Sequence, residues 1–203
     1  MLPCRGGGTL SALRAFFAID LSPEVRTELA RVMAAARLAL QDEPIRWVHV
    51  ETLHLTLRFL GETSPQVLED VRRAAADAAR AWRAFDLEVG GLGCFPDSRN
   101  PRVIWAGGRE PSGTLAALAA ELESIAQRYG FLAEPRAFSA HLTIGRVKER
   151  LSAEGGRTLG TFIEKSRGES YGIVAVRAVE LFKSDLHPGG PVYTSLAHLS
   201  LAG

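Results

Sequence analysis

The segment TLHLTLRFL, residues 52–60, decides the fold of this chain. Its apolar and polar residues alternate, which is the period of a β-strand with one buried face. The pattern returns in FSAHLTIGRV, residues 138–147, and the two histidines are separated by 141 minus 54, or 87 residues. An internal duplication is the simplest explanation, because a repeated motif strand implies a repeated supersecondary unit.

Alternate side chains of a strand share one face. In each motif strand the histidine and the threonine two residues later therefore lie side by side, and the residues between them point into a core. We expect two such pairs, His54 with Thr56 and His141 with Thr143. If a pseudo-two-fold relates the halves, the two pairs face each other across one small volume.

Strand and helix patterns alternate on both sides of the motif strands. The expected strands cover residues 14–19, 52–60, 85–89, 103–106, 138–147, 173–182 and 192–201, with a short extended segment at 47–50. The expected helices run from Ser22-Pro23 to residue 40, from Ser64-Pro65 to residue 82, over 112–129, and over 159–166. Serine followed by proline is typical of an N-cap and a first helical position. We predict an α+β fold with two pseudo-symmetric lobes, a single domain at residues 14–203 and a flexible tail at 1–13.

Composition narrows the class of protein. A chain of 203 residues with 46% hydrophobic residues can bury a sizeable core, and its apolar runs are much shorter than the roughly 20 residues that span a bilayer. A net charge of +1 excludes a protein that grips long nucleic acid by charge alone, so any RNA contact must be local. Cys4 and Cys94 lack metal-ligand spacing and an evident disulfide partner, which favours the cytoplasm.

Two imidazoles and two hydroxyls suit the opening of a cyclic phosphodiester. The reaction needs a base for the attacking water, an acid for the leaving ribose oxygen, and donors for the non-bridging oxygens. Histidine serves both proton transfers because its ordinary pKa of about 6.5 allows one neutral and one charged imidazole near neutral pH. We therefore expect no metal and no cofactor.

The other histidines fit this pattern less well. HLSL at residues 198–201 has no partner at the repeat spacing, and it is expected to form an exposed terminal edge strand. His49 and His187 lack the threonine. We therefore assign the chemistry to His54 and His141 alone.

The chain resembles the 2H phosphoesterase superfamily, and within it the RNA 2',3'-cyclic phosphodiesterase (2'-5' RNA ligase-like) family. The resemblance extends from residue 14 to 201 and includes RAFFAIDLSPEV, RWVHVETLHLTLRFLGE, GLGCFPDSRNPRVIWAGG, FSAHLTIGRV and ELFKSDLHPGGPVYTSLAHLSL. It implies a LigT-like fold in which antiparallel sheets line a central cleft and helices lie outside. Ala140 stands where the family often has proline, which loosens the entry to the second motif strand.

The resemblance also implies roles for individual residues. His54 is expected as proton donor, His141 as acceptor, and Thr56 and Thr143 as phosphate ligands, although near-symmetry leaves an exchange of the histidines' roles open. The family's phosphate-site arginine matches Arg146. Strict alternation from His141 places Arg146 on the opposite face, so it needs a bulge or a strand end to reach the cleft.

The expected reaction is metal-independent hydrolysis of RNA 2',3'-cyclic phosphate ends, tRNA fragments among them, to 2'-phosphates, with weak reverse 2'-5' ligation. The enzyme is expected to be a monomer without membrane contact. One alternative is a phosphodiesterase for a small cyclic nucleotide or cyclic ADP-ribose phosphate, which uses the same chemistry in a different pocket. Another is a non-catalytic RNA-end binding protein, for which a double histidine variant would still bind RNA ends.

Overall fold

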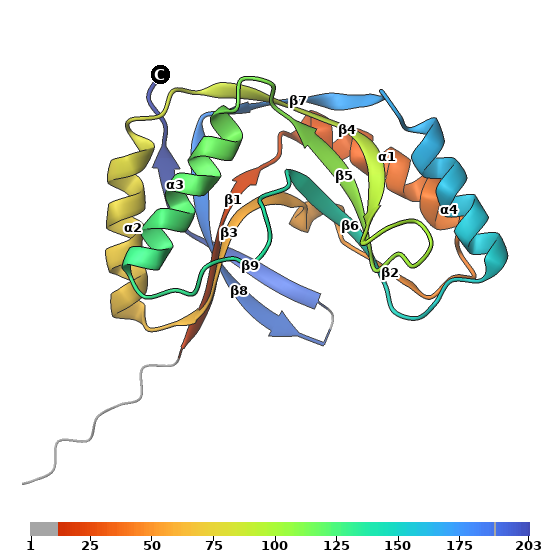
Figure 1. Ribbon diagram of the computed structural model, residues 1–203, viewed down its shortest axis with the longest axis horizontal. Coiled ribbons are helices and arrows are strands. Elements are labelled where there is room, and N and C mark those ends of the chain that lie inside the picture. The colour runs from red at the N-terminus through yellow and green to blue at the C-terminus, as the bar shows by residue number, and fades with distance from the viewer. Residues whose placement is uncertain (1–11, 189) are drawn as a thin grey trace, which may run out of the picture.

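The computed structural model describes residues 12–188 and 190–203. Within these residues, nine strands form two antiparallel sheets and four α-helices pack against them (Figure 1). The strands are β1 (Leu13–Asp20), β2 (Ile45–Trp47), β3 (His54–Thr63), β4 (Phe85–Phe95), β5 (Val103–Arg109), β6 (His141–Val147), β7 (Ser170–Val176), β8 (Ala178–His187) and β9 (Gly190–Ser200). The helices are α1 (Pro23–Ala39), α2 (Pro65–Ala79), α3 (Thr114–Arg128) and α4 (Ala153–Lys165), with a 3-10 turn η1 (Val50–Thr52). Of the expected tail at residues 1–13, residues 1–11 lie outside the described part of the chain, and Leu13 already belongs to β1.

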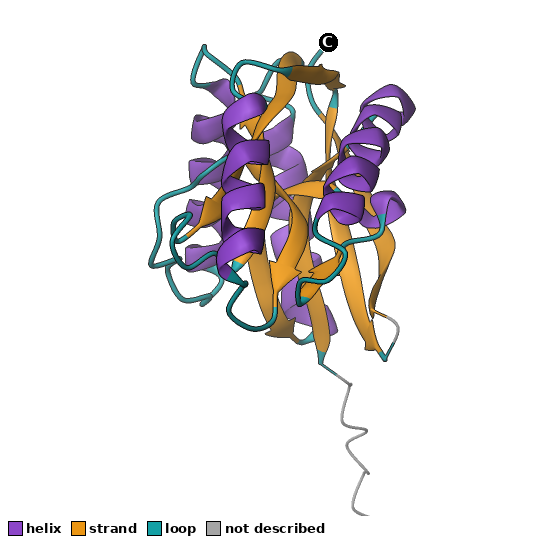
Figure 2. Cartoon of the chain, turned by 90° about the vertical axis from the view of Figure 1, so that its right-hand side faces the viewer, coloured by secondary structure: helices purple, strands orange, loops and turns teal. Residues whose placement is uncertain are grey.

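Each half of the chain contributes to both sheets. The first sheet has the order β3-β1-β8-β9, and the second has the order β2-β6-β5-β4-β7. Helices α2 and α3 pack on the first sheet, whereas α1 and α4 pack on the second. Figure 2 shows the strands in the middle of the molecule with helices on either side. The expected α+β fold with antiparallel sheets and outer helices is confirmed.

Two helix starts follow the predicted capping pattern. The Ser22 hydroxyl accepts a hydrogen bond from the backbone N–H of Val25 at 3.4 Å, and the Ser64 hydroxyl accepts one from Val67 at 3.3 Å. Helix α4 begins at Ala153, earlier than the expected residue 159, because Ser152 caps it despite the glycines in its first turn. None of the helices in the described ranges is both long and apolar enough to cross a membrane.

The expected strand at residues 173–182 is wrong as one element. Strand β7 ends at Val176 in the second sheet, and β8 begins at Ala178 in the first sheet, so the chain passes between the sheets at Arg177. The strand expected at 85–89 is also longer. It continues through the glycine-rich segment to Phe95, with a bulge between Gly90 and Leu92.

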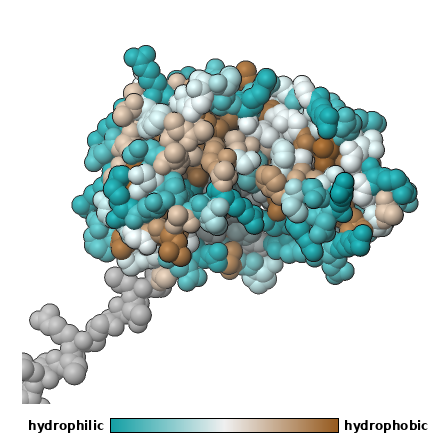
Figure 3. All heavy atoms as spheres, viewed as in Figure 1, coloured by the Kyte–Doolittle hydropathy of each residue, from teal (hydrophilic) through white to brown (hydrophobic). Residues whose placement is uncertain are grey.

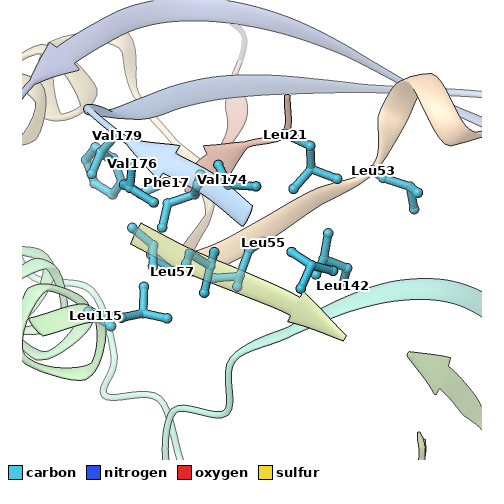
Figure 4. Packing of buried hydrophobic residues seen from close by; sticks show 14 of the residues in the cluster. Phe17, Leu21, Leu53, Leu55, Leu57, Leu115, Leu142, Val174, Val176 and Val179 are labelled. Atoms are coloured by element: carbon cyan, nitrogen blue, oxygen red, sulfur yellow. The ribbon is translucent and has the colours of Figure 1, made fainter. Parts of the chain in front are cut away.

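The apolar residues of both motifs belong to one contiguous core. Leu55 and Leu142 are fully buried and lie close together in Figure 4, and Leu57 and Ile144 are also buried. Full burial of a leucine side chain contributes about 1.5–3 kcal/mol. The same burial directs the intervening histidines and threonines to the opposite faces of the two sheets.

Candidate active site

The two motif histidines are held in the same way. The His54 Nδ1 lies 2.8 Å from the carbonyl oxygen of Thr52, and the His141 Nδ1 lies 2.8 Å from that of Ser139. A carbonyl oxygen only accepts, so in each ring Nδ1 carries the proton and donates it. Each imidazole therefore gains or loses its exchangeable proton at Nε2, the ring nitrogen farther from the backbone.

Both motif strands carry a β-bulge at the same position. Leu57 has no register partner between Thr56 and Arg58, and Ile144 has none between Thr143 and Gly145. The burial pattern is the same in both strands over seven residues, with two successive buried residues after the threonine. In each strand the bulge changes which side chains share the face of the histidine.

The bulge brings Arg146 to the face of His141. On β5, alternation is unbroken through Val103, Trp105 and Gly107, and these residues lie opposite Arg146, Thr143 and His141, respectively. Directly opposed residues of neighbouring strands project to the same face. The structure therefore has the bulge that the sequence argument required, and Arg146 is exposed on this face.

The corresponding bulge in β3 has a different result. Phe59, at the position of Arg146, is exposed on the His54 side, next to Phe16 with ring centroids 5.8 Å apart. Arg58 points the other way and is only 7% exposed. Its guanidinium forms an ion pair with Glu123 of α3 and donates to the carbonyl of Leu132. Arg58 is thus a structural residue, and the sequence analysis had not identified it.

Aromatic rings surround His54. Its ring centroid lies 4.7 Å from that of Phe16, 6.3 Å from Phe182 and 5.0 Å from Tyr193, which meets it edge to face. This burial lowers the pKa of His54, while the Thr52 carbonyl and the carboxylate of Asp20 act in the opposite direction. The environment of the ring therefore favours the neutral imidazole.

Asp20 lies directly opposite His54 in the register of β1 and β3. Its carboxylate forms an ion pair with Arg26 of α1, and the same guanidinium donates to the carbonyl oxygens of Val50, at 2.8 Å, and Glu51, at 3.1 Å. Arg26 therefore ties α1 to the turn that leads into the motif strand, and its positive charge also lowers the pKa of His54.

Fewer rings surround His141. Phe95 of β4 meets it edge to face with centroids 5.1 Å apart, and Trp105 lies 5.3 Å from Phe95. Trp105 is opposite both Thr143 and Gly93 in the register of the second sheet. Its ring lies flat over Gly93, because a methyl group on that glycine would meet the ring at 2.2 Å.

Strand β9 of the first sheet lies near side chains of the second sheet. Tyr193 contacts His54 from within the first sheet, and the charge of Arg146 in the second sheet lowers the pKa of the same tyrosine, against the rise that burial causes. Near the tip of the β8–β9 hairpin, a methyl group on Gly190 would lie 3.2 Å from Nη2 of Arg46 in β2. Side chains of the second sheet therefore approach β9 of the first sheet, the strand whose Tyr193 contacts His54.

His198 has a different environment from the motif histidines. Its Nδ1 contacts the carboxylate of Glu180, which also accepts a hydrogen bond of 2.9 Å from the hydroxyl of Ser195. Its side chain is 64% exposed, in accord with the expected exposed edge strand.

The aromatic partners of the motif histidines, by contrast, had not been identified from the sequence. Only Phe16, in β1, lies in a strand paired with a motif strand, whereas Phe182, Tyr193 and Phe95 lie in β8, β9 and β4.

Comparison with known proteins agrees with this arrangement. The family model of LigT like phosphoesterases matches residues 19–105 and 108–193, and each match contains one motif. An RNA 2',3'-cyclic phosphodiesterase of Methanothermobacter thermautotrophicus is 32% identical over 184 residues, which are 91% of this chain and 96% of that protein.

Solved structures show the same similarity. Escherichia coli LigT in complex with 3'-AMP has a TM-score of 0.74 at 29% identity, covering 95% of this chain and 99% of LigT. The protein TT0787 of Thermus thermophilus has a TM-score of 0.73 at 27% identity, covering 94% of this chain and 98% of its own. Because the family model matches most of the chain and a relative is 32% identical over 91% of it, this chain belongs to the LigT-like phosphoesterase family.

Proposed function

We propose that this protein hydrolyses the 2',3'-cyclic phosphate ends of RNA to 2'-phosphates, and that residues 14–203 form the single bilobal domain that carries the activity. Several relatives that the chain matches over most of its length bear the name RNA 2',3'-cyclic phosphodiesterase. The observation that carries the proposal is the matched anchoring of His54 and His141, which gives two imidazoles with Nε2 free for proton transfer.

The proposed reaction has one chemical step. Nε2 of neutral His141 accepts a proton from water as the water oxygen attacks phosphorus. The bond from phosphorus to the ribose 3'-oxygen breaks, and protonated His54 gives its Nε2 proton to that oxygen. One water is consumed, and the products are a 2'-phosphate and a 3'-hydroxyl. General acid and base groups of this kind each contribute about 10²–10⁴-fold to the rate.

Substrate binding favours protonation of His54 by solvent. Burial lowers the pKa of His54 in the free protein, which favours the neutral ring. A phosphodiester anion next to the imidazole favours the charged ring and raises that pKa. The acid therefore forms when the cyclic phosphate enters, and an empty site holds little of it.

The remaining candidate residues surround the phosphate. The hydroxyls of Thr56 and Thr143 share the faces of the two histidines and are assigned to the two non-bridging oxygens. Arg146, on the face of His141, is assigned to the charge of the phosphate, because a guanidinium matches phosphate oxygens in a bidentate manner. Phe59 occupies the corresponding place in β3, so only one lobe supplies a cation.

The proposal is tested with a short RNA that ends in a 2',3'-cyclic phosphate, incubated with the protein in EDTA. Phosphorus NMR distinguishes the 2'-phosphate from the 3'-phosphate isomer. We expect the 2'-phosphate, and we expect His54→Ala and His141→Ala each to lower kcat by at least about 10²-fold.

His198→Ala is the matched control, because His198 lies in the third motif-like segment but is anchored by a carboxylate instead of a carbonyl. It should retain wild-type turnover. Circular dichroism must show that all three variants are folded. A folded His54→Ala or His141→Ala protein that opened the ring at the wild-type rate would contradict the mechanism.

A further inference from the structure

Two arginines stand side by side on the second sheet. Arg46 of β2 is directly opposite Arg146 of β6 in the antiparallel register, so the two side chains project to the same face. That face also carries Thr143 and His141. Trp47, the next residue, turns to the other face and covers Gly145, where a methyl group would meet its ring at 3.3 Å.

Both guanidiniums are available to a ligand. Arg46 and Arg146 are exposed, and within residues 12–188 and 190–203 neither forms an ion pair. The nearby carboxylate of Glu43 is already bound to the backbone N–H and hydroxyl of Ser152. The face drawn in Figure 3 likewise has a largely hydrophilic rim, with hydrophobic residues in patches inside it.

The arginine pair reaches toward the opposite sheet. A methyl group on Gly190, the first residue of β9, would lie 3.2 Å from Nη2 of Arg46, and the charge of Arg146 lowers the pKa of Tyr193 in the same strand. A strand rises about 3.3 Å per residue, so Arg46 and Arg146 lie about 7 Å farther along the sheet than Thr143. Neighbouring strands lie about 4.8 Å apart, so Arg46 and Arg146 present two adjacent guanidiniums along one row.

We infer that Arg46 binds the phosphodiester on the 5' side of the terminal nucleotide, which makes the site selective for RNA chains over cyclic mononucleotides. This inference rests on the proposed function, because it takes the cyclic phosphate to lie between His54 and His141. With Arg146 at the reacting phosphate, its neighbour Arg46 meets the next phosphate along the chain. The net charge of +1 is sufficient, since two or three local cations replace a global basic field.

The test compares Arg46→Met on two substrates, a dinucleotide that ends in a 2',3'-cyclic phosphate and the corresponding cyclic mononucleotide. Loss of a charge-assisted hydrogen bond to the internal phosphate should lower kcat/KM for the dinucleotide about tenfold, mainly through KM. Turnover of the mononucleotide should stay at the wild-type value. The slope of log kcat/KM against log salt for the dinucleotide should become shallower by about 0.7.

Arg46→Lys should recover part of the loss, because it keeps the charge without the planar fork. Arg37→Met, on an exposed position near the end of α1, is the control for removing one positive charge. It should leave both substrates unaffected. Equal effects of Arg46→Met on both substrates, or no effect on either, would overturn the inference.

A binding measurement separates this inference from the proposed function. Calorimetric titration with the dinucleotide 2'-phosphate and the mononucleotide 2'-phosphate requires no turnover. Arg46→Met should weaken only the dinucleotide, about tenfold. Suppose that Arg46→Met weakens binding of the dinucleotide product alone, but the wild type opens neither cyclic substrate. The proposed hydrolysis then fails while the assignment of Arg46 stands. If both products bind Arg46→Met as they bind the wild type, the assignment of Arg46 fails whatever the activity.

Discussion

Replacement of Gly93 by alanine tests the packing behind His141. Gly93 is buried in β4 beneath the indole of Trp105. A methyl group on Gly93 would lie 2.2 Å from Cζ2 and 2.3 Å from Cη2 of that ring. Carbon atoms in contact are normally about 3.5–4.0 Å apart. The ring must therefore move by more than 1 Å, roughly the difference between these distances. Thr143 lies next to the ring on the same face, and Phe95 connects the ring to His141.

We expect Gly93→Ala to lower the free energy of unfolding by about 2 kcal/mol, within the usual range for overpacking a well-packed site. For a chain of this length that corresponds to a fall in Tm of about 4–8 °C. The same displacement should lower kcat/KM for a cyclic-phosphate substrate by about tenfold, since a misplacement of about 1 Å at a reacting group has effects of this size or larger. Thermal unfolding by circular dichroism and steady-state kinetics measure the two effects.

A double-mutant cycle with Trp105→Leu isolates the clash. Without the ring, the methyl group on residue 93 meets no obstacle there, so Gly93→Ala should cost little in the Trp105→Leu background. The coupling energy should be about 2 kcal/mol. Gly160→Ala in α4 is the matched control, because nothing lies within 4 Å of a methyl group at that position. It should be neutral or stabilising. Wild-type stability of Gly93→Ala, or a coupling below about 0.5 kcal/mol, would refute this account of the packing.

Four further predictions concern the site and the residues that support it. Burial lowers the pKa of His54, so an NMR titration of its ring protons should give a midpoint below about 6.5 in the free protein and a higher one with inorganic phosphate bound. Because the unfolded chain then binds more protons than the native one, the free energy of unfolding should fall as pH decreases through the interval below about 6.5, and His54→Phe should remove that part of the pH dependence. Arg58→Met should destabilise the protein by about 3 kcal/mol in urea unfolding, since it leaves the carboxylate of Glu123 without its ion pair, and Arg58→Met with Glu123→Leu should recover part of the loss; equal stability of the single variant and the wild type would contradict this. Activity should survive EDTA, because in the proposed mechanism the two imidazoles carry both proton transfers, and loss of activity that added metal restores would count against that mechanism.

Local patterns in the sequence were sufficient to predict much of this fold. Ser22 and Ser64 begin helices as expected, because a capping hydroxyl and a following proline act within one turn of the chain. The alternation of the two motifs correctly placed their leucines in the core and their histidines on the opposite faces. Which helix packs on which sheet could not be predicted in this way. It depends on contacts between distant segments, such as α1 with β7 and α2 with β9.

Three irregularities of the strands share one cause, a change of phase in the alternation of apolar residues, and the sequence analysis anticipated only the bulge before Arg146. The buried residues step by three positions instead of two at Leu57 to Leu60, at Ile144 to Val147 and at Val176 to Val179. Continuous alternation cannot keep both residues of such a step on one face, so the strand must bulge or end. At the two motifs the strand continues through a bulge. At Arg177 the chain leaves the second sheet and enters the first.

The two bulges also explain why a nearly symmetric fold can bind an asymmetric substrate. Each bulge brings the second residue after it to the face of the motif histidine, and this residue is Phe59 in β3 and Arg146 in β6. The residue just before it is turned to the opposite face, where Arg58 forms its ion pair with Glu123 and Gly145 lies under Trp47. The arginine of β6, Arg146, therefore lies on the face of the motif histidine, whereas the arginine of β3, Arg58, stands one motif position earlier and points to the core. In the proposed mechanism Arg146 draws the phosphate charge toward the second sheet, while burial among the aromatic rings of the first sheet lowers the pKa of His54 in the free protein.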